Sequence, residues 1–207
     1  MKSSTFKVAA AASAVALAVA FMPAAQANET NTSLAEVLDI GNAAFDTSNT
    51  DYDILTAAIN AVLAAKPTSA VSVLADGDTA LTAFIPTDGA FRKLAWQLGE
   101  RQWRTMSESA VFAAVAGLGI DNVEKVLLHH VVVGPAVNLK AAVAADGATL
   151  ESALGQDLQV SVATTLTIHG SVGGFWQARV SLNRTDINEG NLQLAHGINN
   201  VMVPVLD

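Results

Sequence analysis

Cysteine is absent from the 207-residue chain, which excludes disulfides, thiolate catalysis and thiolate metal sites. Basic residues are scarce as well, with 11 Lys and Arg against 19 Asp and Glu and a formal net charge of -8. Nucleic acids and anionic membrane surfaces attract basic proteins, so neither is an expected partner. Hydrophobic residues make up 51% and charged residues only 14%, which is typical of a chain that folds around a core.

The first 27 residues have the pattern of a cleaved secretory signal peptide. Lys2 and Lys7 give a positive start, residues 8–21 form an apolar run, and Ala25-Gln26-Ala27 is a small-residue cleavage site. The apolar run is too short for a membrane span, and no later run is longer, so we expect no membrane insertion after cleavage. We therefore predict a mature chain of residues 28–207 that is secreted, extracellular or held in the cell envelope.

The mature chain is predicted to contain a short N-terminal helical segment with a linker, followed by one domain. Ser33 and Glu36 have the spacing of a capping box, and the polar residues 42–50 indicate a linker, so residues 28–49 form this N-terminal segment. From residue 50 to residue 207 we expect the domain, which begins with an apolar helical stripe over residues 54–63 capped by Asp51.

A strand, a sharp turn and a helix are predicted in the middle of the chain. Residues 71–74 and 80–85 are apolar runs on either side of an Asp-Gly-Asp turn, which favours two strands. Pro86 ends the second run, Thr87 or Asp88 stands where a helix cap belongs, and apolar residues follow at helical spacing. Residues 96–119 are predicted to be a further helical insertion.

The last third of the chain is predicted to be rich in strands. After a helix capped by Asp121, residues 128–133 are expected to form a strand that places His129 and His130 on opposite faces. Short apolar runs separated by Gly or Asp turns predict further strands at residues 148–150, 158–162, 166–168, 175–182 and 198–206. Helices first and antiparallel strands last indicate an α+β fold.

Sequence motifs for catalysis or for cofactors are missing. The chain has no G-x-S-x-G, no phosphate-binding loop and no H-E-x-x-H, so we predict no catalytic, cofactor-binding or metal-binding residues and no cofactor. The candidate calcium ligands are Asp46, Asp51, Asp53 and the pair Asp76 and Asp78, but none lies in the loop pattern that calcium sites use. We expect these aspartates to be solvated loop residues.

Four segments in the right order resemble the fasciclin domain family. Residues 82–94 (TAFIPTDGAFRKL) are similar to its first motif, T-V-F-A-P-T-D/N-x-A-F-x-x-L. Residues 126–134 (VLLHHVVVG) resemble the central L-L-Y-H-V-V-P-G segment, with His129 in place of the usual Tyr. Residues 149–160 resemble T-L-x-G-x-x-L-x-V, and residues 196–204 (HGINNVMVP) resemble the final H-V-I-D-x-V-L-L-P.

The resemblance implies a bacterial, secreted, single-domain protein with antiparallel sheets that form a wedge or sandwich and helices at one side. It also implies a non-catalytic module for cell adhesion or extracellular-matrix binding, with a surface protein or polysaccharide as partner. We expect the matched motif residues to be structural: Thr82, Phe84, Pro86, Thr87, Asp88, Phe91, His130, His196 and Ile198.

Other interpretations remain open at this point. An envelope enzyme or a small-molecule carrier would need a pocket near His130 or His196, and a structural matrix protein would self-associate. For a binding module, Trp and Arg side chains are the expected contacts because they are enriched at binding hot spots. The candidates for that contact surface are Trp96, Arg101, Trp103, Arg104, Phe175 and Trp176.

Overall fold

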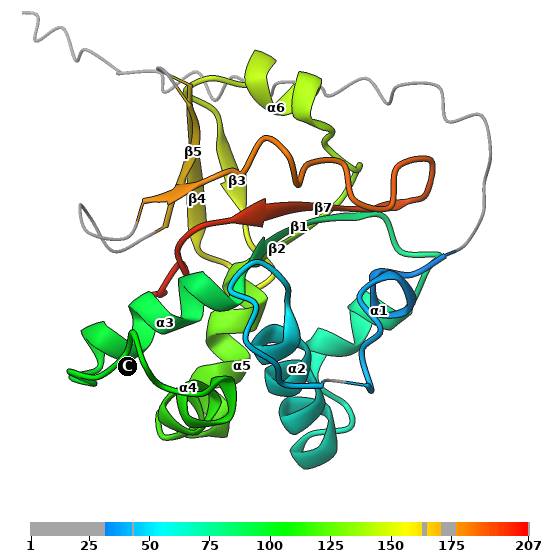
Figure 1. Cartoon of the computed structure of the whole chain (residues 1–207). Helices are drawn as coiled ribbons and strands as arrows, with labels where there is room; N and C mark the ends of the chain where they lie inside the picture. The colour runs from blue at the N-terminus through cyan, green and yellow to red at the C-terminus, as the bar shows by residue number, and fades with distance from the viewer. Residues whose placement is uncertain (1–31, 43, 163–164, 171–176, 207) are drawn as a thin grey trace, which may run out of the picture.

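The computed structural model describes residues 32–42, 44–162, 165–170 and 177–206 (Figure 1). The helices are α1 (Leu34–Val37), α2 (Asp53–Ala65), the 3-10 helix η1 (Ala70–Ala75), α3 (Asp88–Gln97), α4 (Glu108–Ala116), α5 (Ile120–His129) and α6 (Leu139–Ala144). One sheet has the order β2 (Val131–Val133), β1 (Leu81–Pro86), β7 (Gln193–Ile198). The other has the order β3 (Thr149–Glu151), β4 (Asp157–Val162), β5 (Leu166–His169), β6 (Ala178–Arg179).

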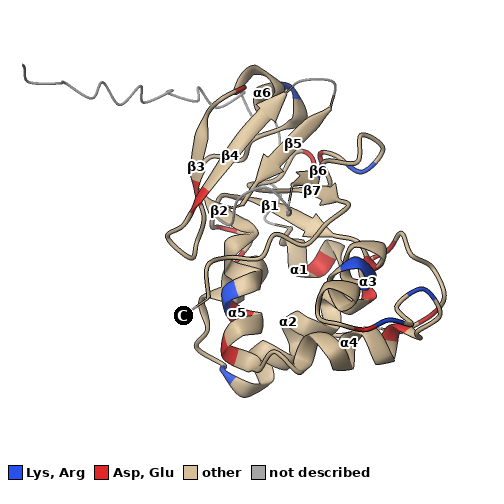
Figure 2. Ribbon diagram, turned by 90° about the vertical axis from the view of Figure 1, so that its left-hand side faces the viewer, with Lys and Arg blue, Asp and Glu red and all other residues tan. Residues whose placement is uncertain are grey.

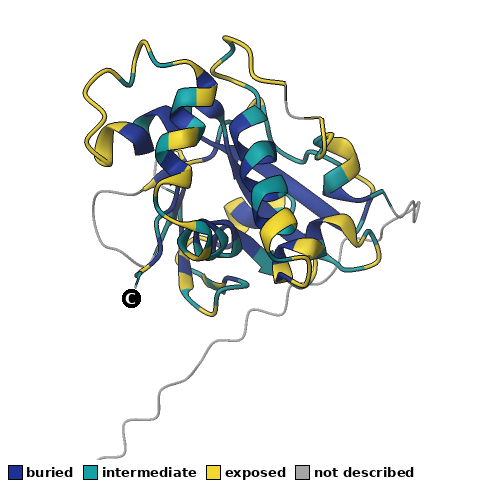
Figure 3. Ribbon diagram, turned by 90° about the horizontal axis from the view of Figure 1, so that it is seen from below, coloured by how far each residue is buried: buried dark blue, intermediate teal, exposed yellow. Residues whose placement is uncertain are grey.

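Strand β1 lies at the centre of the fold, and each of its six residues is buried. Side chains alternate along a strand, so Leu81, Ala83 and Ile85 pack into the cluster formed with the helices. Phe84 points the other way, into the cluster formed with the second sheet. The first sheet therefore lies between helices α2 to α5 and the second sheet, as Figure 1 shows. In the view from below, buried strands lie behind helices whose outer faces are exposed (Figure 3).

Strand β7 pairs with β1 in parallel, although more than 100 residues separate them along the chain. The register places Phe84 opposite His196 and Pro86 opposite Ile198. On its other edge β1 pairs with β2 in the antiparallel sense, with Thr82 opposite Val132. The α+β class with two small sheets is confirmed, while the expectation of antiparallel strands throughout is wrong for β1 and β7.

Several predicted elements are confirmed by the structure. Ser33 and Glu36 form the expected capping box at the start of α1. The stripe at residues 54–63 lies on α2, and the strand before Pro86 is β1. The residue that caps α2 was predicted wrongly, because its N-cap is Tyr52 and the Asp51 side chain makes no capping bond there.

Other element boundaries differ from the sequence prediction. Residues 70–75 are a 3-10 helix rather than a strand, and the helical insertion at 96–119 is interrupted by turns between α3 and α4. The cap of α5 is Gly119 rather than Asp121, and the last strand is residues 193–198 rather than 198–206. The proposed signal peptide, residues 1–27, lies outside the described residues, and no described helix is long and apolar enough to cross a membrane.

Candidate functional site

The polar motif residues gather around β1 rather than around an open pocket. Thr82 is fully buried, and its hydroxyl accepts a hydrogen bond from the Val137 N–H at 2.8 Å. The Phe84 and His196 rings, which face each other across the β1–β7 pair, have centroids 6.0 Å apart. Phe91 and Ile198 are also buried, so the matched segments meet in the core as one packed unit.

His130 joins the end of α5 to the C-terminal segment. It is the C-cap residue of α5 and not a strand residue, which corrects the sequence prediction. Its Nδ1 donates to the Val126 carbonyl at 2.7 Å, and its Nε2 accepts from the Met202 N–H at 2.8 Å. This pattern uses one donor and one acceptor, which suits a neutral imidazole. Burial lowers the pKa of His130 to about 3, in agreement with the neutral form.

His196 makes an equivalent connection on the other side of β1. Its Nε2 donates to the Val137 carbonyl at 2.7 Å, and its Nδ1 accepts from the Asp186 N–H at 3.3 Å. Burial lowers the pKa of this imidazole as well. With both nitrogens occupied, neither His130 nor His196 has a lone pair or proton left for a substrate.

His129 lies on the last turn of α5 and is fully buried. Its Nδ1 is 3.3 Å from the Ser152 hydroxyl, which itself donates to the Gln156 carbonyl at 2.8 Å. Because the Ser152 proton points to that carbonyl, the pair lacks the arrangement of a base that activates a nucleophile. Burial lowers the pKa of His129 to about 4, so it is neutral near pH 7.

The cavity beside His130 is far smaller than a ligand pocket. It has a volume of about 20 Å³ and is lined by apolar residues such as Leu55 and Leu127. Such a space holds about one water molecule, whereas ligand pockets measure about 300–1,000 Å³. A larger surface depression of about 520 Å³ borders α1 and includes neither His130 nor His196. Among the residues that the structure describes, the geometry thus gives no support to a carrier or enzyme pocket at these histidines.

Asp88 caps a helix other than the one predicted. Thr87 is the N-cap residue of α3, but its side chain makes no capping bond, and Asp88 instead accepts bonds from the start of α2. Its two oxygens accept from the N–H groups of Asp53 at 3.3 Å and Ile54 at 2.9 Å. The 49–51 loop packs closely here, since a Cβ at Gly89 would lie 3.0 Å from the Asn49 carbonyl oxygen.

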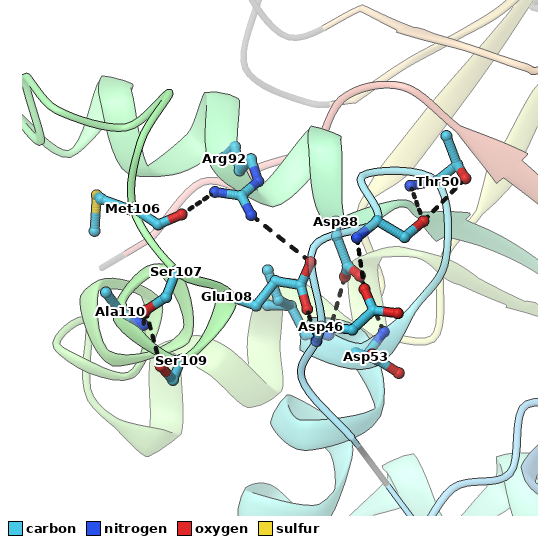
Figure 4. A network of polar contacts seen from close by, with 12 residues as sticks. Asp46, Thr50, Asp53, Asp88, Arg92, Met106, Ser107, Glu108, Ser109 and Ala110 are labelled. Atoms are coloured by element: carbon cyan, nitrogen blue, oxygen red, sulfur yellow. Dashed lines mark hydrogen bonds and ion pairs between the residues drawn. The ribbon is translucent and has the colours of Figure 1, made fainter.

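An acidic cluster surrounds this connection (Figure 4). Its members are Asp46, Asp51, Asp53, Asp88 and Glu108. Burial, followed by the hydrogen bond shared with the Asp51 carboxyl, raises the pKa of Asp88 to about 8. Burial also raises the pKa of Glu108 and of Asp53. Arg92 is the cation beside the cluster, with its Nη2 3.7 Å from Glu108 Oε1 and its Nη1 bound to the Met106 carbonyl.

The surface candidates lie at the end of α3 and in the turn after it. Trp96 is 58% exposed and Leu98 41% exposed. Trp103 is partly buried, and the Arg104 guanidinium lies 4.3 Å from the centroid of its ring. Arg101 is exposed in the same turn. Figure 2 shows charges of both signs gathered around α3 and the segment that follows it. Phe175 and Trp176 lie outside the described residues.

Two buried polar residues that join distant segments were not predicted from the sequence. Gln193 is fully buried; its Oε1 accepts from the Leu34 N–H, and its Nε2 faces the carbonyls of Val73, Asp76 and Thr79 at 2.8 to 3.2 Å. Glu108, the first residue of α4, is fully buried and accepts from the Asp46 N–H at 2.6 Å. Nothing in the local sequence around Gln193 or Glu108 indicates a contact with residue 34 or residue 46.

Comparison with known proteins identifies the fold. The family model for the fasciclin domain matches residues 55–204. The chain belongs to the fasciclin domain family. No curated protein matches the sequence. Among solved structures, the FAS1 domain pair of the insect cell adhesion molecule fasciclin I aligns with a TM-score of 0.51 and 15% identity.

The likeness to fasciclin I is one of fold. The alignment covers 78% of this chain and 48% of the other, so the chain spans about half the length of that domain pair. Fasciclin domains are associated with cell adhesion and are generally non-catalytic binding modules. The recognition from four sequence segments and the α+β fasciclin fold are therefore confirmed.

Proposed function

We propose that the protein is a secreted, non-catalytic module that binds a protein or polysaccharide of the cell surface or extracellular matrix. The observation that carries the proposal is membership of the fasciclin domain family across residues 55–204. The signal-peptide pattern of residues 1–27 agrees with an extracellular site of action. The bonded state of His130 and His196 supports the non-catalytic role, because their nitrogens are engaged within the fold.

The favoured contact surface is the Trp96 patch, defined as Trp96, Leu98, Arg101, Trp103 and Arg104. Leu94 and Ala95 of α3 face the core, while Trp96 extends into solvent. An exposed indole leaves a large apolar area in water, and covering it with a partner is favourable. The contact between Arg104 and Trp103 restrains both side chains before binding, which lowers the entropy lost on association.

A retention assay tests the proposal. The purified chain is immobilised and exposed to the surface and secreted fractions of its source, with proteins and glycans identified separately. Saturable retention of one component is expected. A folded chain that retains nothing from any fraction would refute the binding-module proposal.

Matched variants locate the contact. Trp96→Ala combined with Leu98→Ala is expected to weaken retention at least tenfold, since each removes exposed apolar area without touching the core. Leu182→Ala is the control, because Leu182 is 65% exposed and lies outside the patch. If the double variant binds like the unaltered chain, the Trp96 patch is not the contact surface. Sizing over a concentration series separates partner binding from self-association.

A further inference from the structure

We propose that the partner of the Trp96 patch is a polysaccharide that contains uronic acids, and that Lys93 and Arg179 bind its carboxylates; this inference rests on the proposed function. Lys93 and Trp96 stand three residues apart on α3, so their side chains leave the helix on the same side. Arg179 belongs to β6, and its backbone N–H donates to the Asn199 side chain at 2.9 Å. The Lys93 ammonium donates to the carbonyl of the same Asn199 at 2.7 Å. Asn199 therefore links two cations from different elements beside an exposed indole.

The two cations have no acidic partner in the described part of the chain. No ion pair there includes Lys93 or Arg179. The oxygens that accept from Lys93, those of the Asn199 carbonyl and the Asn200 side chain, are neutral. An ammonium has three N–H donors, so one remains for a ligand. Burial, followed by the positive charge of Arg179, lowers the pKa of Lys93, and a carboxylate placed between the two groups would relieve their repulsion.

Positive charge is in local excess along this face, although the chain as a whole is acidic. Residues 93–104 contain three basic residues and one acidic residue, whereas the whole chain has a net charge of -8. At an ionic strength of about 0.15 M the Debye length is about 8 Å, so carboxylates elsewhere in the molecule are largely screened from a ligand at this face. The planar guanidinium groups of Arg179 and Arg101 can each hold a carboxylate through two parallel hydrogen bonds. The charge of this face therefore complements a polyanion that carries carboxylates.

The surroundings of Trp96 favour a sugar chain over an acidic protein. A specific protein interface buries about 800 Å² on each partner around an apolar centre. Here the exposed apolar side chains are Trp96 and Leu98, and the exposed amides Gln97 and Gln102 lie beside them in the sequence. Amide groups both donate and accept hydrogen bonds, which suits sugar hydroxyls. The flat indole can cover the apolar face of a sugar ring while the cations bind the carboxylate at its edge.

Calorimetric titration of the purified chain with polygalacturonate at an ionic strength of about 0.15 M tests the proposal. Saturable binding is expected. Methyl-esterified polygalacturonate keeps the sugar rings but loses the charge, and polyglutamate keeps the carboxylates but has no sugar rings. Each is expected to bind at least tenfold more weakly. A folded chain that does not bind polygalacturonate would overturn the proposal, as would equal binding of either matched ligand or tighter binding of dextran sulfate.

Three variants assign the surface. Arg179→Gln keeps the backbone bonds to Asn199, and Trp96→Ala removes an exposed side chain, so both should fold; each is expected to weaken binding of polygalacturonate at least tenfold. Lys140→Gln is the control, because Lys140 is an exposed cation on α6, at the opposite end of the molecule from α3 (Figure 1). Unchanged binding in both Arg179→Gln and Trp96→Ala would refute the assignment.

The outcome can be separated from that of the proposed function. If the retention assay yields a protein that binds through the Trp96 patch while polygalacturonate does not bind, the inference fails and the binding module stands. If the folded chain binds neither polygalacturonate nor any surface component, both fail. Saturable binding of polygalacturonate that the Trp96→Ala and Arg179→Gln variants lose supports both.

Discussion

Replacing Asp88 with Ala should remove the connection between α3 and α2. The Asp88 carboxyl accepts the N–H groups of Asp53 and Ile54 at the start of a 13-residue helix. Losing this cap leaves buried N–H groups without an acceptor, which costs about 1–3 kcal/mol. We therefore expect the free energy of unfolding to fall by about 1–3 kcal/mol, with a drop in Tm of roughly 3–10 °C.

Replacing Asp88 with Asn should cost far less, and its effect should depend on pH. With a pKa of about 8, Asp88 is protonated near neutral pH and shares a hydrogen bond with Asp51. An Asn side chain keeps an oxygen for the Ile54 N–H and an amide donor for the Asp51 carboxylate. The fasciclin motif that residues 82–94 resemble also carries Asp or Asn here. We expect a loss below about 1 kcal/mol at pH 6, within the range for one neutral hydrogen bond.

The sign of the pH effect follows from the raised pKa. The folded state holds a proton on Asp88 that the unfolded chain releases above about pH 4. The contribution of Asp88 to the free energy of unfolding is therefore largest below pH 4 and decreases as the pH rises toward 8. Because Asn does not titrate, the Asp88→Asn variant should lack this decline and become the more stable protein at pH 9.

Urea unfolding, monitored by far-ultraviolet circular dichroism from pH 5 to pH 9, gives the free energy of unfolding of the unaltered protein, Asp88→Ala and Asp88→Asn. Asp78→Asn is the matched control, since it removes one exposed carboxylate from another turn. A loss below 1 kcal/mol for Asp88→Ala at pH 6 would show that the α2 cap contributes little. Parallel pH profiles for Asp88→Asn and the unaltered protein would show that Asp88 is not the titrating group.

Two further predictions concern buried polar residues. Gln193→Ala should lower the free energy of unfolding by about 1–3 kcal/mol, because it leaves the buried Leu34 N–H without its acceptor. A loss under 1 kcal/mol in urea unfolding would contradict this. The lowered pKa values of His130 (about 3) and His129 (about 4) mean that these groups favour folding fully above pH 6.5 and progressively less toward pH 4. Unfolding curves measured from pH 7 to pH 4 test this, and constant stability over that interval would refute it.

Local patterns predicted the elements whose signals lie within a few neighbouring residues. The capping box at Ser33, the apolar stripe of α2 and the strand that ends at Pro86 follow from propensity and periodicity. The strand prediction for residues 128–130 was wrong because the β-branched Val131–Val133 follow the C-cap residue of α5 at once. Their strand preference does not reveal that the preceding helix continues through His129.

The candidate site could be predicted only in part, because its contacts join distant segments. Asp88 was identified as a capping residue, but the helix that it caps begins 35 residues earlier in the chain. Glu108 contacts Asp46 across 62 residues, and Gln193 contacts Leu34 across 159. No local period or spacing carries such information, since these contacts arise only when the parallel β1–β7 pair and the helices have packed.

The polar motif residues act at the junctions between elements, and this limits what they can do chemically. His130 bonds α5 to the Met202 backbone, His196 bonds β7 to Val137, and Asp88 bonds α3 to α2. For His130 or His196 to act as a general base, the imidazole would have to give up a hydrogen bond that holds two segments together. Catalysis at these positions would therefore oppose stability. Recognition of a partner then depends on residues outside the junctions, and the exposed Trp96 patch is the surface that the variants test.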